Sequence, residues 1–128
     1  MIFDSMYFQN MVIGSAMQAA IFRNEVISNN IANADTPGFK KSRVEFEDSL
    51  QNALDKISRT GERDLSGVSM RAVITHDTFN YRIDENNVDM EVEMSELYQN
   101  AARFDALVAM SQNNSRRFNL ILSGSAGR

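Results

Sequence analysis

The stretch MSELYQNAARFDALVAMSQNNSRRFNLIL, residues 94–122, decides the fold. Apolar and small side chains recur in it at alternating steps of three and four residues, the heptad-like spacing of a helix that packs lengthwise on other helices. Asp89 precedes the stretch as an N-cap, and Glu93 lies in the first turn, where the helix dipole favours negative charge. The predicted packing seam consists of Met94, Leu97, Ala101, Phe104, Val108, Phe118 and Leu122.

The opposite end of the chain predicts a second long helix. From about residue 3 to residue 33 apolar residues again recur every three or four positions, and the predicted packing stripe includes Val12, Ala19, Phe22 and Val26. The helix must end near Ala34, because Thr36 precedes a proline and is pushed out of the α region. Pro37 and Gly38 suit the two central positions of a type II turn.

These signals divide one structural unit into three parts: an N-terminal helix at 1–34, a turn and small central insert at 35–88, and a C-terminal helix at 89–128. Apolar spacing in the insert predicts a short helix from about Val44 to Arg59. Residues 70–75 and 78–83 predict two short strands, forming a β-hairpin around His76 and Asp77.

The predicted fold class is therefore mainly α. Neither terminal helix can bury its stripe alone, so the two are expected to form an antiparallel coiled-coil-like pair, with the small α/β insert between them. A pair of helices still leaves apolar surface open. The pattern favours a subunit that needs neighbours.

Composition excludes most other classes of function. The chain has 128 residues, 43% of them hydrophobic and 23% charged, which suits one folded domain, and its net charge of −4 argues against nucleic acid as the main partner. With no cysteine and one histidine, thiolate chemistry and any site with two imidazoles are excluded. The serines lack a neighbouring base, and the acidic run at 84–93 does not fit an EF-hand. We predict no catalytic residue, no metal site and no cofactor.

The sequence also lacks the usual membrane and secretion signals. No apolar run approaches the roughly 18 residues needed to span a bilayer. The first basic residue is Arg23, so there is no basic region ahead of an apolar stretch, as a signal peptide requires. We expect a soluble chain made without a cleaved signal peptide.

Two segments resemble the signatures of the flagellar axial proteins, the rod and hook family of the bacterial flagellum. The first resembles the end of that family's N-terminal helix and the turn after it, through Asn29, Asn30, Ile31, Asn33, Asp35, Thr36, Pro37, Gly38 and Phe39. The second is similar to the start of the family's C-terminal helix, through Asn87, Val88, Asp89 and Glu93. Hook and distal-rod relatives carry large inserted domains, so the length of this chain is similar to that of the short proximal-rod members.

The resemblance implies a structural subunit of the flagellar basal body. Such proteins form the proximal rod, which transmits torque across the periplasm, are exported by the flagellar type III apparatus without a cleaved signal, and assemble through their terminal helices. The implied partners are other rod proteins and further copies of this chain, together with the adaptor FliE and the membrane ring and export gate at the rod base. No enzymatic activity is implied.

Two points remain open from the residues alone. The heptad spacing fits equally well a soluble helical adaptor or binding module that forms a small closed oligomer. The asparagines at 29, 30 and 33 have low helix propensity, so they either bond to a neighbouring chain or cap their own helix locally.

Overall fold

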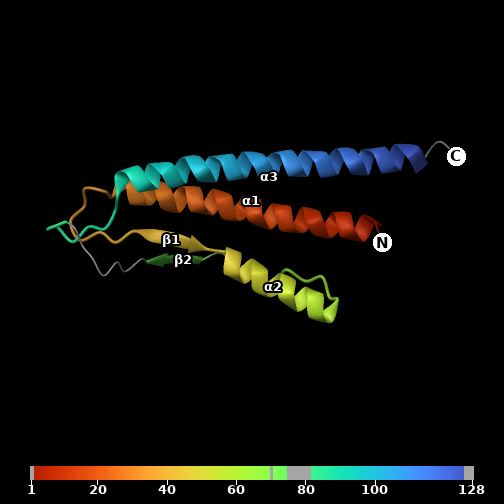
Figure 1. The fold of residues 1–128 in the computed structure, drawn as a ribbon, viewed down its shortest axis with the longest axis horizontal. Coiled ribbons are helices and arrows are strands. Elements are labelled where there is room, and N and C mark those ends of the chain that lie inside the picture. The colour runs from red at the N-terminus through yellow and green to blue at the C-terminus, as the bar shows by residue number, and fades with distance from the viewer. Residues whose placement is uncertain (1, 70, 75–81, 126–128) are drawn as a thin grey trace.

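The computed structural model describes residues 2–69, 71–74 and 82–125. Its elements are, in chain order, α1 (Ile2–Ala32), β1 (Ser42–Glu45), α2 (Glu47–Thr60), β2 (Arg71–Ile74) and α3 (Met90–Ser125). Figure 1 shows α1 and α3 side by side, with the N- and C-termini at the same end of the molecule, so the pair is antiparallel. The prediction of a mainly helical chain with two long terminal helices is confirmed.

Helix α1 is buried on two sides because it lies between α3 and the insert (Figure 1). Toward α3, buried residues recur every seven positions, as Met6, Ile13, Ala20 and Ile27. Toward the insert, Ala19 forms the core with Val44 and Phe46, and partly buried residues pack around it. These surrounding residues are Ala16, Phe22, Val26, Leu50 and Val68.

The insert contains a two-stranded antiparallel sheet. Strand β2 confirms the prediction of a strand near residues 70–75, but its partner is β1, which precedes α2, with Ser42 opposite Ile74. Val44 therefore lies in a strand, where it is buried between exposed neighbours, and not in the predicted helix. Its burial follows the period of two typical of strands, and the helical spacing begins only after Phe46.

The other half of the predicted hairpin falls mostly outside the described part of the chain. Residues 75–81, which include His76, Asp77 and most of the predicted strand at 78–83, lie outside the described residues. Residues 82 and 83 form a bend and a turn.

Local signals set the helix ends. Helix α2 ends at Gly61, which has a φ of 73° and donates its backbone N–H to the carbonyl of Ile57 at 2.8 Å. Asp89 caps α3 as predicted, because its Oδ1 accepts the backbone N–H groups of Glu91 at 3.0 Å and Val92 at 3.3 Å.

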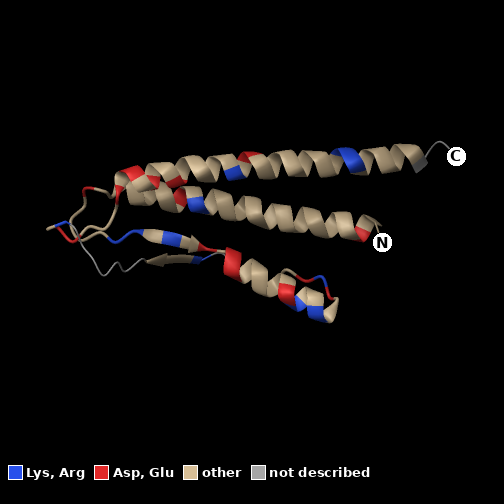
Figure 2. Ribbon diagram, viewed as in Figure 1, with Lys and Arg blue, Asp and Glu red and all other residues tan. Residues whose placement is uncertain are grey.

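Charge is distributed unevenly along the helix pair. Figure 2 shows charged residues gathered on the insert and at the end of the molecule where α1 gives way to the insert. Between Asp4 and Arg23, α1 carries no charged residue. Of the helices in the described ranges, none combines the length and apolar character needed to cross a membrane.

Candidate functional site

The two signature segments, about fifty residues apart in sequence, meet in space. The end of α1 and the turn after it (29–42) contact the loop and first turn that begin α3 (82–93) through a dense set of hydrogen bonds. We call this region the junction. It joins the two long helices at one end of the pair, where the insert leaves them.

Asn86 lies at the centre of the junction. Its side chain is 1% exposed, and its Nδ2 donates to the carbonyl oxygens of Asn33, Ala34 and Thr36 at 3.0, 3.0 and 2.8 Å. Its Oδ1 accepts the N–H of Val88 at 2.8 Å. These carbonyls belong to the turn that follows α1, beyond its last residue, Ala32. Asn86 therefore holds this turn from the loop that precedes α3, because buried carbonyl groups need hydrogen-bond donors.

The turn after α1 has the geometry predicted for Pro37 and Gly38. The N–H of Phe39 donates to the carbonyl of Thr36 at 3.2 Å, and Gly38 has a φ of 72°, as the third position of a type II turn requires. The N–H of Gly38 also donates to the carbonyl of Asp84 at 2.7 Å. A backbone hydrogen bond thus joins the turn after α1 to the loop that precedes α3.

Asn30 joins three elements. Its Oδ1 accepts the N–H of Ser42 at 2.9 Å, while its Nδ2 donates to the Ser42 carbonyl at 2.8 Å and to Glu93 Oε2 at 2.9 Å. Glu93 is 1% exposed, and Lys41 Nζ lies 3.7 Å from its Oε1. A buried carboxylate needs such partners, because burying an unpaired charge is costly. One amide therefore ties α1 to the start of β1 and to the first turn of α3.

The remaining signature residues fill or border the junction. Val88 is buried, Asn87 Oδ1 accepts the N–H of Lys41 at 2.7 Å, and Ile31 and Phe39 are half-buried. Asn33 Nδ2 donates to the carbonyl of Asn29 in the same helix at 2.8 Å, which is local capping. Six signature residues are exposed: Asn29, Asp35, Thr36, Pro37, Gly38 and Asp89.

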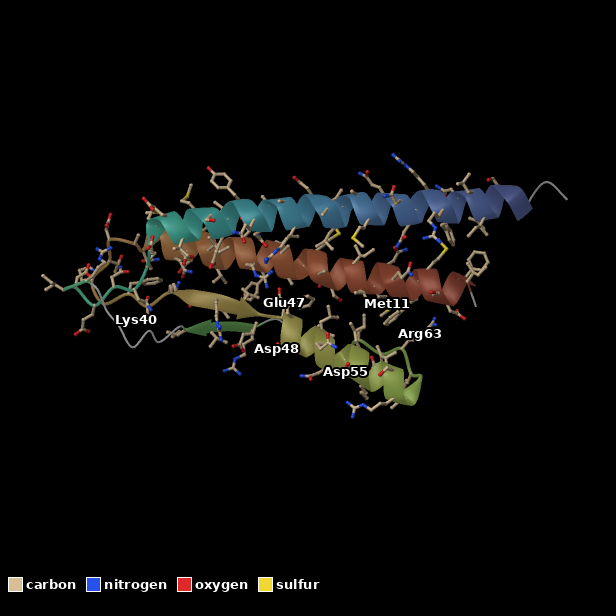
Figure 3. All side chains as sticks on the ribbon, viewed as in Figure 1. Met11, Lys40, Glu47, Asp48, Asp55 and Arg63 are labelled. Carbon is tan, nitrogen blue, oxygen red and sulfur yellow. The ribbon has the colours of Figure 1, made fainter. Side chains whose placement is uncertain are left out.

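A bidentate ion pair closes the junction. Arg82 donates from Nε and Nη2 to the two carboxylate oxygens of Asp84 at 3.1 and 2.9 Å, and from Nη1 to the carbonyl of Ala34 at 3.0 Å. Partial desolvation of Asp84 would raise its pKa. The hydrogen bond from the N–H of Asn86, together with Arg82, outweighs this effect, so the pKa of Asp84 lies below its ordinary value. Lys40 donates to the carbonyl of Glu85 at the same end of the molecule (Figure 3).

The predicted seam residues are divided among several surroundings. On α1, Ala19, Phe22 and Val26 belong to the cluster with the insert, and Val12 is half-buried. On α3, half-buried residues are Met94, Leu97, Phe104 and Val108, whereas Ala101, Phe118 and Leu122 are exposed. The ring of Phe118 contacts that of Phe3 edge-on, with centroids 5.8 Å apart.

The hydrogen bonds of three buried asparagines, one in the junction and two on α3, were not identified from the sequence. Asn86, Asn100 and Asn114 are buried single amides, and no apolar pattern includes them. Their only signal is position, since Asn100 and Asn114 stand seven and twenty-one residues after Glu93 on the same helix.

The described ranges hold no arrangement suited to metal binding, since no three acidic or histidine side chains converge there. The clefts found in the described part are open to solvent. One, between α1 and the end of α2, is lined by Tyr7, Phe8 and Met11, with the Arg63 guanidinium 5.7 Å from the Phe8 ring centroid. Figure 3 shows Met11 and Arg63 on its two sides.

Known proteins of similar sequence identify the family of this chain. The family profile described as "Flagella basal body rod protein" matches residues 12–40, which run from the middle of α1 into the junction. FlgB of Bacillus subtilis (strain 168) is 32% identical over 115 residues, covering 86% of this chain and 89% of the relative. FlgB of Borreliella burgdorferi is 33% identical over 116 residues, covering 78% and 84%.

The chain belongs to the FlgB family of flagellar basal body rod proteins. The FlgB relatives match most of this chain and most of their own length. The flagellar hook protein FlgE of Treponema pallidum, in contrast, is 41% identical over 59 residues that make up only 12% of its length. As a member of a structural rod-protein family, the chain is not an enzyme.

Proposed function

We propose that this FlgB-family chain is a structural subunit of the proximal rod, which transmits torque across the periplasm. It is exported by the flagellar type III apparatus without a cleaved signal peptide and assembles through α1 and α3. The observation that carries the proposal is the similarity to rod proteins over most of the chain.

The surface of α3 supports assembly through this helix. Within the described ranges, α1 is the element that packs along α3, and other faces of α3 bear large apolar side chains that are exposed. These are Met90, Val92, Tyr98, Met110, Leu120 and Leu122. Exposed apolar surface spread along a helix is typical of contacts with other chains.

The proposed partners follow from the rod assignment. They are other rod proteins and further copies of this chain, with the adaptor FliE, the membrane ring and the export gate at the rod base. A continuous tube also requires contacts that repeat from subunit to subunit, because a closed interface would end the assembly.

A charge placed on the uncovered seam of α3 tests the proposal. Ala101 is exposed and belongs to the predicted seam, so Ala101→Asp should leave the chain folded but prevent rod assembly. We would express the variant in a bacterium lacking its own copy, and measure swimming in soft agar and the presence of rods in isolated basal bodies.

Ala106→Asp is the matched control, because Ala106 is also an exposed alanine of α3 but is not part of the predicted seam. Motility should be lost with the first variant and kept with the second. Normal motility with Ala101→Asp, or a small closed oligomer of the parent chain in sedimentation, would contradict assembly through this seam and favour the adaptor function.

A further inference from the structure

Polar side chains cross the α1–α3 interface at three levels. Nearest the junction, Asn30 Nδ2 donates to Glu93 Oε2 at 2.9 Å. In the middle, Asn100 Nδ2 donates to the carbonyl of Ala20 at 2.8 Å, and toward the chain ends Asn114 Nδ2 donates to Asn10 Oδ1 at 3.2 Å. We call these contacts the polar layers.

The polar layers do not give the most stable interface that these helices could form. Asn100 is 3% exposed, and among the described residues its Oδ1 has no hydrogen-bond partner. A buried acceptor without a donor is destabilising, and an apolar side chain of similar volume would avoid this cost. Stability alone therefore does not account for an asparagine at this position.

The arrangement of the layers distinguishes one alignment of the helices from the others. Positions 93, 100, 107, 114 and 121 of α3 are spaced by seven and read Glu, Asn, Leu, Asn, Ile. On α1 the corresponding face alternates apolar Met6, Ile13 and Ile27 with the polar groups of Asn10, Ala20 and Asn30. A purely apolar heptad stripe packs almost equally well after a slip of seven residues, about 10 Å along the axis. A slip that brings Phe3 opposite Ser111 would place Asn100 opposite Ile13 and Asn114 opposite Phe3, so two buried amides would face apolar side chains. In the same slip Glu93 would exchange Asn30 for Arg23 and leave the junction.

We propose that the polar layers are a register code, which restricts α1 to one alignment with α3 and disfavours slipped pairings within one chain or between copies. At Asn100 the unpaired acceptor lowers stability, while the buried amide discriminates between registers, as single buried asparagines do in coiled coils. The inference goes beyond the rod assignment, because it concerns which helix alignment forms, whatever the chain assembles into.

Engineered disulfides can report the register, since the chain has no cysteine of its own. The rings of Phe3 and Phe118 are in contact, so Phe3→Cys with Phe118→Cys reports the observed alignment. Phe3→Cys with Ser111→Cys reports an alignment displaced by one heptad. In the purified full-length chain, oxidation should give at least about fivefold more intramolecular disulfide for the first pair than for the second.

Asn100→Leu combined with Asn114→Leu should abolish this preference. We expect the two disulfides to form within about twofold of each other, with more disulfide-linked dimers. The thermal midpoint of the cysteine-free chain carrying both leucines should be unchanged or higher. Asn113→Leu combined with Asn119→Leu is the matched control, because both asparagines are exposed on the same helix, and it should keep the parental preference.

Either of two results would overturn the register code: an unchanged preference in the Asn100→Leu, Asn114→Leu chain, or no preference in the parent. Because the readout is a disulfide ratio in the isolated chain, it does not depend on rod assembly. A failed motility test would therefore leave this result interpretable.

Discussion

Replacing Gly14 and Gly38 with alanine should have opposite effects on stability. Gly14 lies inside α1, whereas Gly38 has a φ of 72°, and neither has an atom within 4 Å of where a Cβ would stand. Gly14→Ala should stabilise the chain by about 1 kcal/mol, because alanine loses less backbone entropy in a helix. Gly38→Ala should destabilise it by about 1 kcal/mol through backbone strain. Urea denaturation of the two variants measures both values, and equal signs would contradict this interpretation.

Asn86 should be the most sensitive polar residue of the junction. Asn86→Ala removes donors to three carbonyls in the turn after α1 and an acceptor for Val88, so we expect a loss of about 2–3 kcal/mol in the free energy of unfolding. The same measurement on Asn52→Ala, an exposed site on α2, should show a change within about 0.5 kcal/mol. Similar losses for the two variants would show that the hydrogen bonds of Asn86 contribute little to stability.

Asp84 should make the junction sensitive to acid. Its pKa is lower in the folded chain than its ordinary value, so its charged form stabilises the fold. This contribution is complete above the ordinary carboxylate pKa of about 4 and is lost as the pH falls through the lower folded pKa. Asp84→Asn should therefore flatten the dependence of stability on pH below about pH 4 and leave its slope near pH 7 unchanged. Unfolding curves recorded across this range test the prediction, and an unaltered acid limb would contradict it.

Among the elements, those specified by local signals were predictable and those formed by distant pairing were not. Asp89, Gly38 and the heptad spacing of α3 each act within a few residues, so the helices and their ends follow from the sequence. Strand β1 pairs with β2 across the whole of α2, and a four-residue strand gives too short a pattern to identify its partner. The signature segments could be located by resemblance, but their meeting through buried amides such as Asn86 needs the tertiary fold.

The insert should depend on one aromatic side chain. Phe46 is 4% exposed and joins Val44 and Ala19 in the core between α1 and the insert. Phe46→Ala should cost about 3–4 kcal/mol, which a two-stranded sheet and one short helix cannot offset. We expect much faster proteolysis within the insert, with most of the far-ultraviolet helical signal retained from α1 and α3.

Phe118→Ala provides the comparison for this prediction. Phe118 is 40% exposed and touches Phe3 only at a ring edge, so its truncation should cost about 1 kcal/mol and leave the insert resistant to protease. An insert equally resistant in the Phe46→Ala chain would mean that contacts other than this core hold it on α1.

At the scale of the whole molecule, the two ends of the helix pair differ in how they are held. At the junction, buried hydrogen bonds link α1, the insert and α3, whereas at the opposite end large apolar side chains such as Ile2, Tyr7 and Leu120 are exposed. In hydrogen exchange on the purified chain, amides at 24–33 and 90–100 should exchange at least about tenfold more slowly than those at 5–12 and 114–122. The difference in exchange rate should shrink in Asn86→Ala, because the junction causes it.

Incorporation of the parent chain into rods should selectively protect the end whose amides exchange fast, since neighbouring subunits would cover the apolar residues exposed there. Uniform protection along both helices of the isolated chain would mean instead that the α1–α3 contact alone stabilises them. The end with exposed apolar residues would then be ordered without neighbouring subunits.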